Sequence, residues 1–178
     1  MSNKPVKNTR LSPATEEDKI KFLKEKKRIS LDGNLEGTRG IYGFFAINGT
    51  EEICCFYVGK ANNIYNRMIV KGRAHLYDYY SICNDGNVKR RDVHDLLDKY
   101  LDAGYSIEVR IIKEVPYNEK ESTQYNANQL VFEEIKALLD FQKKGQCPDQ
   151  YHEAVKPDEK NYLEKTYPKN RDDRHAQQ

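Results

Sequence analysis

The chain has 178 residues, of which 38% are hydrophobic and 33% charged, a composition that supports one folded core and excludes a fully disordered chain. No apolar run approaches the roughly 20 residues that cross a bilayer, and residues 1–10 lack the apolar stretch of a secretory signal. We therefore expect a soluble, cytoplasmic protein with no membrane partner. The four cysteines form no CxxC pair, which argues against a structural zinc site of the usual spacing.

Positive charge is concentrated at the start of the chain. The net charge is only +2, but residues 1–30 carry nine Lys or Arg against four Asp or Glu. This basic N-terminal arm, residues 1–36, either follows a phosphate backbone or is a solvated tail. We expect one short helix within the arm, capped by Thr15, because acidic residues follow Thr15 in the first turn.

The main domain, residues 37–146, alternates strand-like and helix-like segments. Two strand-like runs are joined through Asn48-Gly49 by a loop that looks longer than two residues, which predicts a hairpin. A helix capped by Asn62 or Asn63, a helix over 93–101, a strand over 106–115 and a long helix over 122–144 follow. These elements predict an α+β domain with a small three-stranded antiparallel or mixed sheet flanked by helices. The charged C-terminal tail comprises residues 147–178.

One carboxylate of the long helix lies on its apolar side. With a helical period of about 100° per residue, Glu134 falls among Leu130, Val131 and Leu138, whereas Glu133 points to water. A carboxylate in that position needs a cation, a hydrogen-bond donor or a metal. The residues alone leave two interpretations open, a salt bridge at the edge of the core or a metal ligand, with Glu133 as the alternative ligand.

Two short motifs lie on the expected hairpin. Gly40-Ile41-Tyr42 is on the first strand, Tyr57-Val58-Gly59 is on the second, and Arg67 follows Tyr57 by ten residues. This ordered set, with a glutamate in a later amphipathic helix, resembles the GIY-YIG nuclease superfamily over residues 39–145. The run from Tyr57 to Arg67 looks closest to the nuclease domain of bacterial excision-repair incision proteins. The sequence EVPY, residues 114–117, is similar to the same region of phage intron homing nucleases.

The resemblance implies the GIY-YIG nuclease fold and a metal-dependent hydrolysis of phosphodiester bonds. In this family a glutamate holds one divalent ion, Mg²⁺ or Mn²⁺, and this role falls to Glu134. Arg67 would bind phosphate with its planar guanidinium. Tyr42 would act as the general base for water, and Tyr57 would orient water or phosphate. Lys60 would lower the tyrosine pKa or contact the phosphate.

The region after Arg67 departs from the family pattern. Lys71 stands where homing-type members have a histidine, and His75 lies eight residues after Arg67. We assign His75, Lys71 and Arg73 to substrate binding. Many members have an asparagine twelve to fifteen residues after the glutamate, but the first asparagine after Glu134 is Asn161.

The resemblance predicts a free-standing endonuclease of the restriction or mobile-element kind that cuts DNA; the residues do not separate DNA from RNA. Because cutting both strands with one active site per chain calls for two copies or two successive nicks, we also expect a homodimer. The alternative function is a catalytically silent module with the same fold that binds nucleic acid or another protein.

Overall fold

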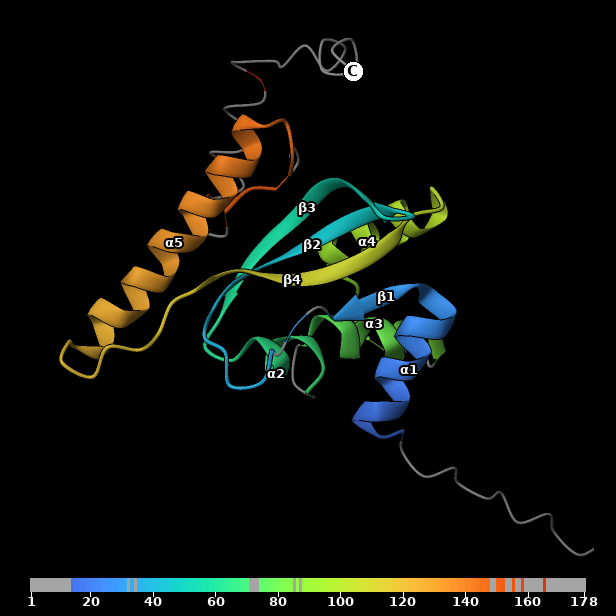
Figure 1. Ribbon diagram of the computed structural model, residues 1–178, viewed down its shortest axis with the longest axis horizontal. Coiled ribbons are helices and arrows are strands. Elements are labelled where there is room, and N and C mark those ends of the chain that lie inside the picture. The colour runs from blue at the N-terminus through green and yellow to red at the C-terminus, as the bar shows by residue number, and fades with distance from the viewer. Residues whose placement is uncertain are drawn as a thin grey trace, which may run out of the picture.

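We describe the protein from a computed structural model. It describes residues 14–31, 33, 35–70, 74–84, 86, 88–147, 150–152, 155, 158 and 165. These residues form an α+β structure with one mixed sheet and helices against both of its faces (Figure 1). The elements in chain order are α1 (Glu16–Lys27), β1 (Ile29–Leu31), β2 (Gly40–Asn48), β3 (Glu51–Ala61), α2 (Ile64–Met68), α3 (His75–Asn84), α4 (Asp92–Asp102), β4 (Ser106–Glu114) and α5 (Thr123–Lys143).

The sheet has four strands in the order β1-β4-β2-β3, so the prediction of three strands is wrong. β2 is antiparallel to both β3 and β4, and the additional strand, β1, is parallel to β4 with Ile29 opposite Ile107. β1 has only three residues, too few to display the alternation by which a strand is identified in a sequence. The α+β class itself is confirmed.

The β2–β3 hairpin is tighter than expected. Asn48 pairs with Glu51, which leaves a loop of two residues, Gly49 and Thr50. Gly49 has a φ of +63°, a conformation that tight hairpin turns require and that glycine adopts without strain. The prediction of a longer loop is therefore wrong, because β3 begins directly after the turn with the charged pair Glu51-Glu52.

The described part of the N-terminal arm packs on the rest of the molecule. Thr15 caps α1 in a capping box with Asp18, which confirms the expected start of this helix. Leu23 of α1 and Ile29 of β1 are buried in the same core cluster as Phe44 of β2. Residues of α1 and β1 therefore share a core with the main sheet, and residues 1–13 lie outside the described part of the chain.

Each face of the sheet has its own apolar core. The larger cluster joins one face to α1, α3 and α4, whereas α5 covers the other face with Leu130 and Leu138 (Figure 1). α3 is not predicted by the sequence pattern. Its buried side includes the polar residues His75 and Ser81, which interrupt the apolar periodicity by which a helix is identified. No helix in the described ranges is long and apolar enough to cross a bilayer.

Candidate active site

Gly40 and Gly59, the glycines of the two motifs, are required by close packing at the open end of the β2–β3 hairpin, which is the end opposite its Gly49-Thr50 turn. A Cβ atom at Gly59 would lie 2.5 Å from the hydroxyl oxygen of Tyr42, which faces Gly59 across the two strands. A Cβ atom at Gly40 would lie 2.2 Å from the backbone oxygen of Lys113. The glycines therefore allow β4 and the Tyr42 ring to approach the hairpin as closely as they do.

Tyr42 forms a hydrogen bond with a histidine at the start of α3. Its hydroxyl group lies 2.8 Å from Nε2 of His75, and the side chain is only 1% exposed. The ring of Tyr57, which is half-buried, lies next to both, with centroid distances of 6.4 Å to Tyr42 and 5.5 Å to His75. The structure thus brings the two motif tyrosines together, and it packs His75, assigned to substrate binding, against Tyr42 with only 2% of its surface exposed.

Burial sets the protonation state of this pair. Burial is the main cause that raises the pKa of Tyr42, and the charge of Arg67 opposes it. Burial is also the main cause that lowers the pKa of His75, followed by the charges of Arg67 and Arg91. Both side chains are therefore neutral at pH 7, and one hydrogen bond joins the Tyr42 hydroxyl group to Nε2 of His75. Nδ1 of His75 has no hydrogen-bond partner among the described residues.

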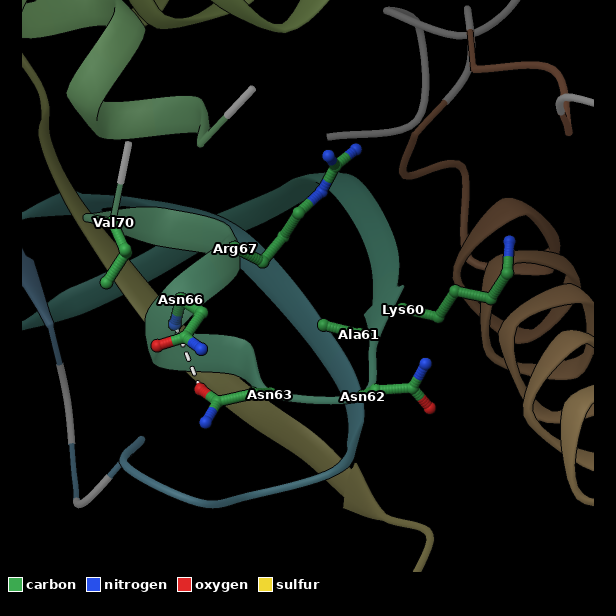
Figure 2. A pocket seen from close by; sticks show the side chains of 7 residues that line it. All are labelled: Lys60, Ala61, Asn62, Asn63, Asn66, Arg67 and Val70. Atoms are coloured by element: carbon green, nitrogen blue, oxygen red, sulfur yellow. Dashed lines mark hydrogen bonds between the residues drawn. The ribbon is translucent and has the colours of Figure 1, made fainter. Parts of the chain in front are cut away.

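An open pocket with a volume of about 510 Å³ lies beside the hairpin end, and cations and amides line it. Its lining comprises Lys60, Ala61, Asn62, Asn63, Asn66, Arg67 and Val70. α2, which carries Arg67, is capped by Asn63, whose side chain accepts a hydrogen bond from the backbone of Asn66. Figure 2 shows the cationic ends of Lys60 and Arg67 extending in the same direction from β3 and α2. This lining suits a phosphate group, which accepts hydrogen bonds and carries negative charge.

Glu134 reaches this site from α5. Its side chain is 12% exposed, and its Oε2 lies 2.7 Å from Nζ of Lys60. The expected position of Glu134 on the packed side of the helix is therefore correct, and its partner is the cation that the salt-bridge interpretation requires. The expectation that Glu133 points to water is wrong, because its side chain is only 14% exposed and its carboxylate pairs with Lys113 of β4 at 2.7 Å.

A second histidine contacts Glu134, and the sequence interpretation missed it. Nε2 of His152 lies 3.0 Å from Oε2 of Glu134, and its side chain is 11% exposed. His152 follows α5 in the segment expected to be a charged tail. No periodic pattern or motif spacing identified it, because only the folded chain brings it back beside α5. Lys71 and Arg73, assigned to substrate binding, lie outside the described residues.

The residues at this site fit a divalent cation held by one carboxylate. Among the described residues, no three His, Cys, Asp or Glu side chains gather into a multi-ligand metal centre. Mg²⁺ is commonly held by one or two carboxylates, with water and substrate phosphates as its other ligands. Glu134 has such a carboxylate, and it lies next to the pocket because Lys60, which lines the pocket, contacts its Oε2. The Lys60 ammonium group shows that a positive charge is accommodated at this oxygen.

Comparison with protein-family models, with curated proteins and with solved structures gave no match for this chain.

Proposed function

We propose that the protein is a metal-dependent endonuclease that hydrolyses DNA phosphodiester bonds. The observation that carries the proposal is that the Tyr42–His75 and Lys60–Glu134 pairs, contributed by four different elements, lie at the same end of one hairpin, where the charges of Arg67 and Glu134 both act on Tyr42. The resemblance of its motifs to GIY-YIG nucleases supports the same activity, and we assign the sheet and its helices to that fold.

Substrate phosphate would bind to Arg67 and Lys60. The guanidinium of Arg67 offers a planar pair of donors that matches two phosphate oxygens. Lys60 adds a flexible ammonium group, which exchanges its contact with Glu134 for one with the phosphate. These contacts are made to the backbone of DNA and carry no sequence information, so base readout belongs to other parts of the surface.

Tyr42 and His75 would remove the proton from the attacking water. The tyrosine oxygen takes a proton from water as its own hydroxyl proton passes to Nε2 of His75, so the pair needs no free tyrosinate at rest. The charge of Arg67 eases release of the hydroxyl proton because it lowers the pKa of Tyr42 against the effect of burial, and the same charge also lowers the pKa of the acceptor His75. Since Tyr42 is 1% exposed, this route requires the side chains around its hydroxyl to open when substrate enters.

Glu134 would hold Mg²⁺ or Mn²⁺. A divalent ion at this carboxylate supplies positive charge to the phosphate oxygens as negative charge develops on them. The residue's own part is to present a carboxylate beside the phosphate-binding cations, and its burial on the packed side of α5 keeps that carboxylate in place.

Cleavage of supercoiled plasmid tests the proposal. We expect nicked or linear DNA with Mg²⁺ or Mn²⁺ and none with EDTA, and the pattern of bands distinguishes site-specific from random cutting. A parallel reaction with single-stranded RNA separates a DNA nuclease from an RNA nuclease. A protein that retards DNA on a gel but cuts neither substrate would be the silent binding module, and the nuclease proposal would be wrong.

A further inference from the structure

The outer edge of the sheet is covered by a short stretch of chain after α5, which we call the edge segment: Gln146, Cys147 and residues 150–152. β3 is an edge strand, and its outward N–H and C=O groups need partners. At Cys55, the N–H donates to Oε1 of Gln146 at 2.8 Å, and the carbonyl accepts from the N–H of Cys147 at 3.1 Å. The edge segment thus extends the hydrogen bonding of β3 beyond the sheet.

Gln150 fixes the end of the edge segment. Its side-chain oxygen accepts from the N–H of Val58 at 2.8 Å, and its side-chain nitrogen donates to the carbonyl of Val58 at 2.5 Å. A carboxamide carries a C=O acceptor and N–H donors, as a peptide group does, so the Gln150 side chain satisfies both the N–H and the C=O of Val58. His152 follows two residues later, so these bonds hold the chain close to the point from which its imidazole reaches Glu134.

His152 and Lys60 both contact the same oxygen of Glu134. The two nitrogen atoms lie 3.0 Å and 2.7 Å from Oε2. A carboxylate oxygen only accepts, so Nε2 of His152 carries the proton and donates it. When a phosphate draws Lys60 away, a carboxylate that is 12% exposed would lose its cation, which is costly for a buried charge. The imidazole remains as a donor on that oxygen.

We propose that His152 is a positioning residue for the Glu134 carboxylate. Through Nε2 it holds Oε2 in place, so that the carboxylate keeps one orientation while Lys60 moves to the phosphate and a divalent cation binds. The inference rests on the proposed nuclease function and adds to it a residue that the motif pattern does not contain. Hydrogen-bonded partners of this kind contribute about 10- to 100-fold to metal affinity or activity.

The test measures Mn²⁺ affinity by calorimetry, with Mn²⁺ alone as the probe, together with kcat and KM for plasmid cleavage. The full chain is compared with His152→Phe, which keeps a ring without a donor, and His152→Gln, which keeps a side-chain N–H donor. We expect His152→Phe to weaken Mn²⁺ binding about 10- to 100-fold and to lower kcat. His152→Gln should recover most of both losses, which a role in packing alone would not predict.

The inference is overturned if His152→Phe binds Mn²⁺ as tightly as the wild type, or if His152→Gln is as weak as His152→Phe. Urea unfolding of each variant shows whether the fold is retained, and His152→Ala provides a smaller replacement if the phenylalanine does not fit. Failure of the nuclease proposal looks different, because the wild-type chain itself would then neither bind Mn²⁺ nor cut DNA.

Discussion

Tyr42 and Tyr79 are both buried tyrosines whose hydroxyl groups form a hydrogen bond with another side chain, but only Tyr42 lies at the proposed active site. Tyr79 donates to Asp98 at 2.5 Å, away from the hairpin end. Replacing either by phenylalanine removes one hydroxyl group and costs stability of about 1 kcal/mol. We expect Tyr42→Phe to lower the cleavage rate about 10²- to 10⁴-fold, the usual effect of losing a general base.

The matched variant Tyr79→Phe should be destabilised to a similar degree and should cut DNA at close to the wild-type rate. Plasmid cleavage and urea unfolding of both variants measure the two effects separately. Equal loss of cleavage in the two variants would remove Tyr42 from the chemistry and leave it a packing residue.

His75 makes stability dependent on pH in a defined direction. Its folded-state pKa lies well below the ordinary value, mainly because of burial, so the unfolded chain binds a proton more readily below about pH 6.5. The contribution of neutral His75 is fully present above that pH and is lost as the pH falls. We expect the free energy of unfolding to drop by about 1–2 kcal/mol between pH 7.5 and pH 5.5.

Urea unfolding at a series of pH values measures this loss, and His75→Asn should reduce it. His94 has a pKa lowered by burial as well and supplies the part of the drop that His75→Asn leaves. A free energy of unfolding that stays constant between pH 7.5 and pH 5.5 would contradict a buried, neutral His75.

At the scale of elements, β1 makes the N-terminal segment part of the fold. Ile29 is buried where β1 pairs with β4, so Ile29→Ala should destabilise the whole chain by about 2–5 kcal/mol. Lys26, exposed on α1, is the control, and Lys26→Ala should change stability by less than about 0.5 kcal/mol. The midpoint of urea unfolding measures both, and an unchanged midpoint for Ile29→Ala would mean that the segment is a detachable arm.

The elements that the sequence predicts well are those with local signals. Thr15, Asn63 and Ser122 cap their helices through side-chain oxygens, and such caps can be identified without knowledge of the fold. β1 and α3 lack local signals, because one is too short to alternate and the other buries His75.

The same distinction applies to the candidate site. The helical period was sufficient to place Glu134 on the packed side of α5. Its contact with His152 depends on the path of the chain around the edge of β3, and the Tyr42–His75 bond depends on how α3 packs on the sheet. Neither path leaves a pattern in the sequence, since the residues of each pair are joined only by tertiary packing.

At the scale of the whole molecule, the outer side of α5 favours a homodimer. Tyr125, Phe132 and Leu139 lie seven residues apart, and their exposed fractions are 49%, 62% and 50%. Seven residues are about two helical turns, so the three side chains form a line centred on Phe132.

We therefore expect the wild-type chain to sediment as a dimer and Phe132→Asp to sediment as a monomer. Ile53→Asp, at an exposed apolar residue of β3, is the control and should leave the dimer intact. Sedimentation velocity measures the difference. A monomeric wild type, or a Phe132→Asp variant that remains dimeric, would contradict pairing through α5.

The central claim is that Glu134 serves phosphodiester hydrolysis, and its neighbour Glu133 provides the most direct comparison. Both carboxylates pair with a lysine at 2.7 Å, but only the partner of Glu134 lines the pocket. The measurement is plasmid cleavage with Mg²⁺ by the wild type, Glu134→Gln and Glu133→Gln, each checked for an unchanged unfolding midpoint. Our account predicts a loss of about 100-fold or more for Glu134→Gln alone, the scale on which one transition-state-stabilising group acts. Equal cleavage by Glu134→Gln and the wild type would contradict it.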